Sequence, residues 1–571
     1  RPDQARAASP PRRGKSYPLA RRRTLPALPV RSCSGILLHF IRLRTMALFG
    51  TFFLVALRLS LAQAKLRHEV PHQPLALLLD EEDTGGAMAL SLMQQGQRVG
   101  TTSTDWSLST DRRENMSCSP LRNRGTHFTV EIEVGTPGQK FDVVADTGSD
   151  NVIVASCLCS DAGRCRAEDK CYRGTNRSST FRMPSSFNGE TPAIVLTFGS
   201  GQVEAVMATD LVRVGKVSTP MHDSVLLMVD QALSISGPFE GILGLGLPRS
   251  EEQDRELVPP APPAHGRHQP HMLQGVRPKG FLESAGIGRF SMCFNDNADG
   301  VLRLGTPAEP GALGSIGTFH WGLDFRGISV GEETQPVAFC NSKEPGQDTP
   351  CGAIPDSGTT VIMADPDHLR SLFSQLCDSW PRCQEQARGS EYSKFELFQV
   401  LLLQCEDWMH NSTGLSELPP IHFHLAGAGG NTQTLKLDGN SYVFVTREDE
   451  VHYVTKHLFG IFPVRVAVAT GRKRNVCLPA FASHSYNTQK NGPVWILGTP
   501  LFYEFQVGYD LESKPPSITF ADQSCGSCAS PALLASSARL AKDGGERAAR
   551  RRPREVHGPI RTPSFDHGLP L

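Results

Sequence analysis

Apolar and polar residues alternate along much of this chain, with the period of two that is typical of a β-strand. The stretch 127–134 reads His-Phe-Thr-Val-Glu-Ile-Glu-Val, and Gly-Thr-Pro-Gly follows it at 135–138. This pattern predicts a half-buried strand that ends in a turn. Similar short strand patterns, separated by glycine and proline turns, recur to Ala521, so the sequence predicts a mostly β protein.

The segment before this region carries a targeting pattern. A basic leader, 1–64, contains an apolar run that begins at Met46 and is followed by Ala-Gln-Ala at 62–64. A short apolar run before small residues predicts a secretory signal peptide over 46–64. The run is shorter than the roughly 20 residues that a membrane span needs, so no stable span is expected after signal cleavage. A signal anchor that also uses the apolar residues 36–38 is the alternative.

Three further segments lack the strand pattern. Residues 65–122 are polar and mixed and are interpreted as a removable propeptide, and the Ala-, Arg- and Pro-rich 530–571 is predicted to be a disordered basic tail. The proline-rich stretch 251–278 is interpreted as an exposed insertion. Three histidines in it lack the nearby acids and the helical spacing of a metal site, so no metal is predicted there. They are His265, His268 and His271.

The composition is that of a globular protein from an oxidising compartment. Of the 571 residues 39% are hydrophobic, and 58 Lys and Arg balance 58 Asp and Glu, which indicates no nucleic-acid partner. Of the 15 cysteines, Cys33 lies in the leader and the other 14 span Cys118 to Cys528. An even number favours disulfides, and hence secretion, without deciding their connectivity. Glycosylation acceptors at Asn115, Asn176 and Asn411 fit the same compartment.

Two short stretches of the chain repeat one another, and each carries an aspartate on a glycine turn. Apolar residues lead into Asp-Thr-Gly-Ser at 146–149 and into Asp-Ser-Gly-Thr at 356–359. The tripeptide Ile-Leu-Gly follows downstream of each, at 242–244 and at 496–498. A duplicated motif of this kind predicts two related lobes that share one site.

The site predicted from this repeat contains two carboxyl groups, those of Asp146 and Asp356. Gly148 and Gly358 permit the tight turns and the close approach of the two loops. Carboxylates within hydrogen-bond distance cannot both ionise, so the pair shares one proton over a wide acid range. The ionised partner can take a proton from a water while the protonated partner donates to a carbonyl oxygen. This chemistry is general acid–base hydrolysis without a covalent intermediate.

The two aspartate motifs and the two Ile-Leu-Gly segments resemble the pepsin-like family of aspartic endopeptidases, over about Thr126 to Ala521. The resemblance implies a bilobal acid protease fold with an N-terminal lobe over 123–305, a C-terminal lobe over 306–529 and the active site in the cleft between them. It implies a polypeptide substrate, no cofactor, no metal, no nucleic acid and a monomer. It also implies a zymogen that is secreted or held in an acidic vacuolar or lysosome-like compartment.

The resemblance assigns a role to each motif residue. Asp146 and Asp356 are expected to be the catalytic pair, and Gly244 and Gly498 are expected beneath the active-site loops. The hydroxyl groups are expected either to hydrogen-bond the outer carboxylate oxygens or to lock the two loops together. The first role falls to Ser149 and Thr359, and the second to Thr147 and Ser357. Ordinary turn chemistry is the alternative for these hydroxyl groups, because serine and threonine favour turns.

A β-hairpin that closes over the substrate, the flap, is a further expectation from the family. The matching segment is 196–202, in which Phe198, Gly199 and Ser200 are expected to bind substrate. The family usually has a tyrosine at the position of Phe198 and a tryptophan at that of Ile153, and these two side chains hydrogen-bond to each other. Since both polar partners are replaced here, no donor is left unpaired. We interpret the change as a more apolar flap base.

Four cysteines follow the first aspartate within a short stretch: Cys157, Cys159, Cys165 and Cys171. Such spacing is compatible with zinc, but two disulfides are the favoured interpretation in a secreted chain. Together with Cys293, this cluster resembles the nepenthesin and plasmepsin V branches of the family more than the gastric pepsins.

Two other functions compete with peptide hydrolysis. The first is a catalytically weak, pepsin-fold peptide-binding protein, because a fold does not guarantee an activity. Both aspartates and both motif glycines are present, which favours the enzyme. The second is a glycosidase with paired carboxylates, but that function explains neither the duplicated glycine turns nor the paired hydroxyl groups.

Overall fold

The computed structural model describes the chain from residue 116 onward, with gaps. The described ranges are 116–166, 169–184, 193–198, 201–233, 239–249, 278–296, 298–332, 336–409, 414–458, 462–528, 554–555 and 571. The predicted leader and signal peptide, most of the predicted propeptide and the three insertion histidines lie outside these residues. Within them, no helix is both long enough and apolar enough to cross a membrane.

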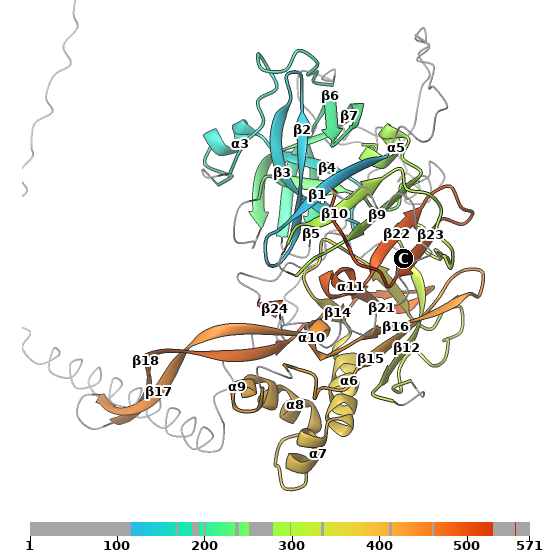
Figure 1. Ribbon diagram of the computed structural model, residues 1–571. Helices are drawn as coiled ribbons and strands as arrows, with labels where there is room; N and C mark the ends of the chain where they lie inside the picture. The colour runs from blue at the N-terminus through green and yellow to red at the C-terminus, as the bar shows by residue number, and fades with distance from the viewer. Residues whose placement is uncertain are drawn as a thin grey trace, which may run out of the picture. The chain divides into compact units, whose positions relative to one another are not determined.

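β-strands are the main regular element of the described chain and far outnumber helical residues, which confirms the predicted mostly β fold class (Figure 1). The largest of its three described sheets has 13 strands. In order across the sheet they are β11 (Leu313–Gly314), β23 (Ser517–Ala521), β22 (Gln506–Asp510), β9 (Arg289–Cys293), β10 (Gly300–Leu304), β1 (Ser117–Asn123), β2 (Phe128–Val134), β3 (Gln139–Asp146), β8 (Gly241–Gly244), β4 (Val152–Ala155), β7 (Val217–Leu233), β6 (Gly201–Val214) and β5 (Ala193–Phe198).

Strands from distant parts of the chain lie side by side in this sheet. β22 pairs antiparallel with β9, where Val507 lies opposite Met292, and both side chains are buried. β1 pairs antiparallel with both β10 and β2. The sheet therefore joins the N-terminal lobe to the end of the C-terminal lobe. β1 belongs to it over Ser117–Asn123, whereas the predicted propeptide range extends to residue 122.

The C-terminal lobe is built on a second sheet, of eight strands. Seven of them follow the order β16 (Thr432–Leu437), β15 (Ile421–Ala426), β12 (Leu323–Val330), β13 (Gly352–Pro355), β21 (Gly492–Leu497), β14 (Ile362–Ala364) and β19 (Phe481–Ser483), and β20 (Asn487–Thr488) pairs with β21. Buried aromatic rings hold its central strands together. The ring centroid of Trp495 lies 5.2 Å from that of Phe325 and 6.1 Å from that of Phe423.

Four helices follow β14, which the strand pattern does not predict. They are α6 (Pro366–Ser379), α7 (Pro381–Ala387), α8 (Lys394–Leu403) and α9 (Cys405–Trp408). α6 begins with Pro366 after the N-cap Asp365, whose carboxylate accepts a hydrogen bond from the amide of Asp367. α8 begins with a capping box between Ser393 and Glu396. The remaining described α-helices are short: α3 (Cys157–Asp161), α5 (Phe281–Ala285), α10 (Gly439–Tyr442) and α11 (Thr499–Glu504).

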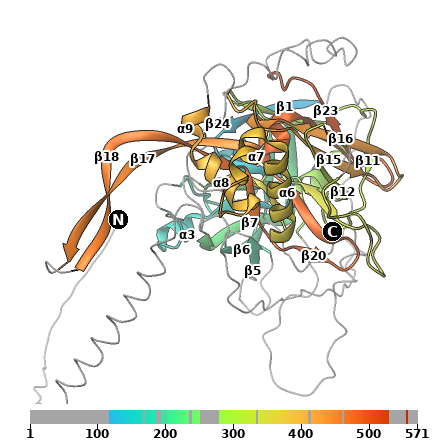
Figure 2. The same ribbon diagram turned by 90° about the horizontal axis from the view of Figure 1, so that it is seen from below.

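A long two-stranded ribbon, β17 (Val443–Leu458) and β18 (Phe462–Pro479), follows α10 (Figure 2). The short strand β24 (Arg554–Glu555) pairs in parallel with β17, where Arg554 lies opposite Phe444. Residue 571 is also described, and its side chain is buried. The sequence predicts disorder over 530–571, whereas these three residues are held by strand pairing or by burial of the side chain.

All fourteen cysteines from Cys118 to Cys528 pair in seven disulfides, which confirms the predicted use of cysteine. The cluster after the first aspartate forms two of them, so zinc is not its occupant. The pairs are Cys118–Cys528, Cys157–Cys171, Cys159–Cys165, Cys293–Cys525, Cys340–Cys351, Cys377–Cys383 and Cys405–Cys477.

Candidate active site

Each motif aspartate lies at the carboxyl end of a strand that runs parallel to a second, buried strand. In the N-terminal lobe β3 ends at Asp146 and runs parallel to β8, with Asp146 opposite Gly244. In the C-terminal lobe β13 leads into Asp356 and runs parallel to β21, with Ile354 opposite Ile496. The short apolar runs before each aspartate suit strands that are covered on both faces. The two lobes therefore repeat one local topology.

The glycines of the two Ile-Leu-Gly segments allow close backbone contacts behind the aspartate loops. A Cβ atom on Gly244 would lie 2.4 Å from the backbone nitrogen of Asn151, and one on Gly498 would lie 2.2 Å from the carbonyl oxygen of Val361. Both contacts are with backbone just after an aspartate motif. Only glycine fits at these two positions, because a Cβ atom cannot approach backbone so closely.

Thr147 and Ser357 join the two loops through four hydrogen bonds. The hydroxyl of Thr147 donates to the carbonyl oxygen of Pro355 (2.9 Å) and accepts from the amide of Ser357 (3.0 Å). The hydroxyl of Ser357 donates to the carbonyl oxygen of Ala145 (2.8 Å) and accepts from the amide of Thr147 (3.0 Å). Both side chains are fully buried. Each loop thus satisfies polar backbone groups of the opposite loop.

Each carboxylate is held by its own turn in the same way. One oxygen of Asp146 accepts from the amide of Gly148 (2.9 Å), and the other accepts from the hydroxyl of Ser149 (2.7 Å). In the second lobe, one oxygen of Asp356 accepts from the amide of Gly358 (2.8 Å), and the other accepts from the hydroxyl of Thr359 (2.5 Å). These contacts fix the orientation of both carboxyl groups.

The two aspartates meet where the loops touch. A Cβ atom on Gly358 would lie 2.2 Å from Oδ1 of Asp146, and one on Gly148 would lie 2.8 Å from Oδ1 of Asp356, so each carboxyl group lies against the opposite turn. Both aspartates are fully buried. Burial, together with the charge of Asp146, raises the pKa of Asp356 above its ordinary value of 3.8, although Thr359 and Gly358 oppose the rise. The pair can therefore hold one shared proton.

The predicted flap corresponds to the hairpin of β5 and β6. Its backbone pairs Phe198 with Gly201, while Gly199 and Ser200 lie outside the described residues. Ile153 lies at its base in a buried apolar cluster and is 1% exposed. The partly buried Ile194 and Leu196 of β5 pack against this cluster. Its other members are Val144, Ala155, Cys159, Cys165, Val203, Ala205, Met207, Leu226, Met228, Phe239 and Ile242.

Two buried aromatic residues beneath the loops are not predicted by the motifs. The hydroxyl of Tyr509 donates toward the carbonyl oxygen of Pro355 (3.3 Å) and the hydroxyl of Thr147 (3.5 Å), and burial raises the pKa of Tyr509, which keeps it protonated. The indole of Trp321 donates to the carbonyl oxygen of Leu245 in the other lobe (3.0 Å). The two rings lie 4.9 Å apart. Strand alternation around Tyr509 indicates a buried residue but not its place beneath the site.

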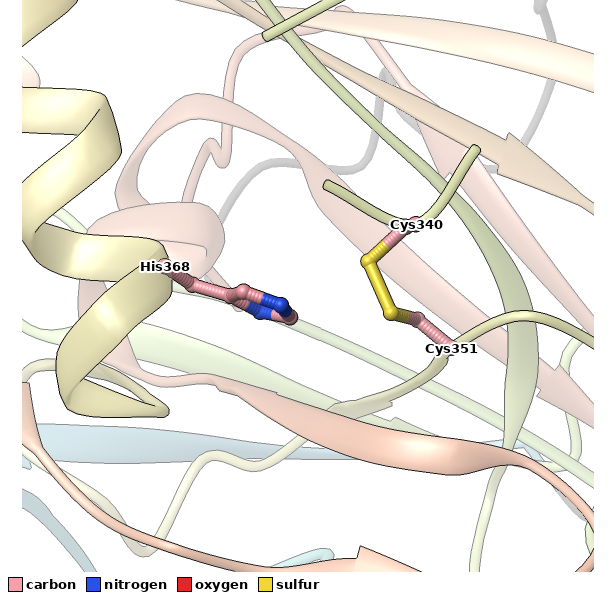
Figure 3. Close-up of side chains that lie close together, drawn as sticks. All are labelled: Cys340, Cys351 and His368. Carbon is pink, nitrogen blue, oxygen red and sulfur yellow. A yellow bond between two sulfur atoms is a disulfide. The ribbon is translucent and has the colours of Figure 1, made fainter. Parts of the chain in front are cut away.

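Cys340, Cys351 and His368 lie close enough together to be considered as metal ligands, and Figure 3 shows the imidazole pointing toward the two sulfur atoms. The sulfur atoms are joined in a disulfide and so offer no thiolate. Nδ1 of His368 accepts a hydrogen bond from the indole of Trp495 (3.2 Å). Burial lowers the pKa of His368, and its ring stacks on Phe339. Cys351 is buried in the core, whereas Cys340 and His368 are partly buried, so the group packs at the edge of the hydrophobic core.

Comparison with known proteins agrees with this geometry. The sequence model of a family described as eukaryotic aspartyl protease matches residues 127–523. Renin of Canis lupus familiaris is 26% identical over 441 residues, which cover 74% of this chain and 87% of that protein. Renin of Echis ocellatus is 23% identical over 400 residues, which cover 68% of this chain and 79% of that protein. Aspartic proteinase A1 of Arabidopsis thaliana is 30% identical over 256 residues, which cover 43% of this chain and 44% of that protein.

Proposed function

Because the chain belongs to the eukaryotic aspartyl protease family, we propose that it is an aspartic endopeptidase in which Asp146 and Asp356 activate a water molecule. The observation that carries the proposal is the pair of buried carboxyl groups, each held by an amide and a hydroxyl of its own turn. Two acids in one buried site, sharing a proton, are suited to general acid–base hydrolysis.

We assign the shared proton to Asp356, because burial and the charge of Asp146 raise the pKa of its carboxyl group. Its O–H then donates to the carbonyl oxygen of the peptide bond, while the Asp146 carboxylate takes a proton from a water. The water oxygen bonds to the carbonyl carbon and a tetrahedral diol forms. The proton on Asp146 passes to the amide nitrogen as the C–N bond breaks, and the diol returns a proton to Asp356. The cycle leaves both carboxyl groups in their starting state.

The remaining motif residues position this pair. Ser149 and Thr359 orient the carboxyl groups directly, and Thr147 and Ser357 hold the two turns against each other. Phe198, Gly199 and Ser200 form the part of the flap that contacts substrate. The apolar cluster around Ile153 supports the flap through packing, in place of a phenol–indole hydrogen bond.

The proposal includes synthesis as a zymogen in the secretory pathway, for secretion or for an acidic compartment. Seven disulfides support an oxidising environment during folding. The glycosylation acceptor Asn176 is exposed on a turn, where its φ is 66°. Expression in secreting cells, followed by sequencing of the mature N-terminus and treatment with an N-glycosidase, tests these points.

The central test is cleavage of a mixed peptide library between about pH 3 and pH 7, with and without pepstatin. Asp146→Asn is expected to lower kcat/KM on the order of 1,000-fold, because it removes the group that accepts the proton from water. Asp161→Asn is the matched control, since that aspartate lies at the exposed end of α3. It is expected to keep full activity.

The same experiment separates the enzyme from a pepsin-fold peptide-binding protein. Pepstatin-sensitive cleavage that is lost in Asp146→Asn and kept in Asp161→Asn supports the endopeptidase. A folded, processed chain that binds peptides but cleaves none of them supports the binding protein. Cleavage that persists in Asp146→Asn would point to a different catalyst.

A further inference from the structure

The ribbon formed by β17 and β18 continues beyond the short strand β24 that joins its base (Figure 2). A register shift after Asp449 separates the base from the residues 451–458 of β17 and 462–469 of β18, which pair only with each other. We call these two stretches the distal ribbon. Neither of its outer edges is paired with another strand of the described chain, so two faces and two edges are left without a covering element.

Large apolar side chains are exposed on both faces of the distal ribbon. Val451 and Tyr453 are 45% and 47% exposed, and Val464 and Val466 are each 37% exposed. Residues directly opposite one another in an antiparallel pair share a face, and successive residues alternate between faces. Val451 and Tyr453 therefore lie on one face. Val464 and Val466 pair with even-numbered residues of β17 and so lie on the other face.

Exposed apolar side chains gather on the distal ribbon more than elsewhere. Seven large hydrophobic side chains are exposed in the described part of the chain, and four of them belong to the distal ribbon. Single exposed apolar side chains are normal, whereas a contiguous group marks an interaction site. The distal ribbon therefore has the apolar character of a surface that a partner covers.

Positive charge accompanies these apolar side chains. No Asp or Glu occurs over 451–474, although acidic and basic residues balance over the whole chain. Arg465 lies on the face of Tyr453, and Lys456 lies opposite Val464 on the other face. Both cations are exposed, and neither forms an ion pair with a described residue. Each face thus combines aliphatic side chains with one cation that has no acidic neighbour.

The base of the ribbon has a different character. Glu448 lies opposite Arg474 and Asp449 lies opposite Lys473, so acidic and basic side chains face each other there. Val445, also at the base, is buried. The uncovered apolar side chains and the uncompensated charge are therefore properties of the distal ribbon and not of the ribbon as a whole.

A bilayer that contains anionic lipid matches both properties of the distal ribbon. Apolar side chains gain free energy at the boundary between headgroups and acyl chains, and Lys and Arg are attracted to negative headgroups, which their long side chains can reach. The ring and hydroxyl of a tyrosine suit the same boundary. A folded protein would cover one face of a ribbon, whereas lipid can surround both faces.

We propose that the distal ribbon is a peripheral docking surface for a membrane that contains anionic lipid. Its four exposed apolar side chains lie at the acyl boundary and its two cations lie among the headgroups. The unpaired edges limit the depth of the contact, because backbone groups without hydrogen-bond partners are costly in hydrocarbon. Membrane docking is a binding property and does not depend on peptide hydrolysis.

Vesicle flotation tests the proposal with the full chain purified from secreting cells. The vesicles contain phosphatidylcholine alone or mixed with phosphatidylserine. The parent chain is expected to float only with the mixed vesicles. Raising the salt from about 0.1 M to about 1 M, which shortens the Debye length from about 10 Å to about 3 Å, is expected to weaken binding. No binding to the mixed vesicles, or equal binding to both compositions, would overturn the proposal.

A first double variant removes the charge of the distal ribbon. Lys456→Gln with Arg465→Gln is expected to weaken binding to the mixed vesicles about tenfold or more. Lys216→Gln with Arg388→Gln is the matched control, because it removes one exposed lysine and one exposed arginine elsewhere in the chain. The control is expected to bind as the parent does, and equal losses in the two double variants would overturn the proposal.

A second double variant removes apolar surface. Tyr453→Thr with Val464→Thr keeps residues that favour strands and is expected to weaken vesicle binding about fivefold. Leu158→Thr with Met183→Thr is the control, since these side chains are 67% and 41% exposed outside the ribbon. Urea unfolding verifies that each variant is folded. Unchanged binding of both ribbon variants would assign the lipid contact to another part of the chain and overturn the proposal.

Tyr453→Trp locates the contact directly. The tryptophans of the described chain are buried, so the added one reports on the distal ribbon; they are Trp321, Trp380, Trp408 and Trp495. Lipids with brominated acyl chains are expected to quench the added fluorescence, and vesicle binding without added quenching would contradict the proposal. Sedimentation without lipid tests the other occupant. A dimer that the ribbon variants abolish, in a chain that binds no vesicles, would show that a second copy covers the distal ribbon.

Discussion

Thr147 and Ser357 exchange hydrogen bonds between the two lobes. The Thr147 hydroxyl donates to a backbone carbonyl of the Ser357 loop, and the Ser357 hydroxyl donates to a backbone carbonyl of the Thr147 loop. The two residues are separated by 210 positions in the chain and are fully buried. Their exchange sets the position of one aspartate turn against the other. The site is therefore a property of both lobes together.

Thr147→Val is expected to lower the free energy of unfolding by about 2–3 kcal/mol, since it removes two buried hydrogen bonds and leaves the Ser357 amide without its acceptor. Thr147→Ser keeps the hydroxyl and is the matched control, with a change below about 1 kcal/mol. Urea unfolding followed by tryptophan fluorescence measures both. Equal stability of the two variants would show that the hydroxyl does not hold the loops together.

Gly358→Ala is expected to lower kcat/KM on the order of 100-fold, because the new Cβ atom would lie 2.2 Å from Oδ1 of Asp146 and must displace that carboxyl group. Gly389→Ala is the control, since a Cβ atom there meets no atom within 4 Å. Initial rates on one peptide substrate measure the difference. An active Gly358→Ala chain would mean that the carboxyl group tolerates displacement.

The raised pKa of Asp356 predicts a pH-dependent stability. A folded-state pKa above the ordinary 3.8 means that the folded chain holds the proton more tightly than the unfolded chain. This contribution is complete below the unfolded pKa and is lost as the pH rises through the folded one. Between about pH 4 and pH 7 the parent chain is therefore expected to lose more than about 1 kcal/mol relative to Asp356→Asn, which cannot titrate.

Urea unfolding at a series of pH values measures this difference. Asp161→Asn, at the exposed end of α3, is expected to follow the parent chain at every pH. Parallel curves for the parent and Asp356→Asn would contradict a raised pKa at this carboxyl group. If the parent chain instead gained stability relative to Asp356→Asn as the pH rises, the pKa of Asp356 would be lowered in the folded chain and not raised.

The disulfides are expected to differ in their effect on stability according to the length of chain they enclose. Cys118–Cys528 joins residues 410 apart, whereas Cys159–Cys165 joins residues 6 apart. Replacing both cysteines of the first pair by serine should lower the free energy of unfolding by about 2–4 kcal/mol more than the same change in the second pair, because the longer loop restricts the unfolded chain more. Urea unfolding of the two double variants tests this order.

The sequence predicted the motif residues of the site better than the side chains that pack around them. The duplicated turns identify Asp146 and Asp356, and the Ile-Leu-Gly segments identify Gly244 and Gly498, because tight turns and close backbone contacts demand particular residues locally. Tyr509 has no such local mark. It acts through a ring and a hydroxyl that reach a loop 362 residues away in the chain.

Elsewhere in the molecule, too, some features have local sequence signals and others do not. The helices α6 to α9 interrupt the strand pattern of the C-terminal lobe, although the Asp365 cap and the Ser393–Glu396 capping box are local signals of their start. The likeness of the cysteine cluster to the nepenthesin and plasmepsin V branches stays a prediction. So do the signal peptide and the propeptide, which lie mostly outside the described residues.

By itself, the sequence determined a mostly β chain with two aspartates on repeated glycine turns and an even number of cysteines that favours disulfides. Turn geometry, strand period and cysteine number are local or compositional properties, so they can be read without a fold. Only the tertiary structure decided which cysteines pair, which aromatic residues lie beneath the site and that Leu571 is buried in the C-terminal lobe. These are contacts between residues far apart in the chain, and packing of the whole lobe selects them.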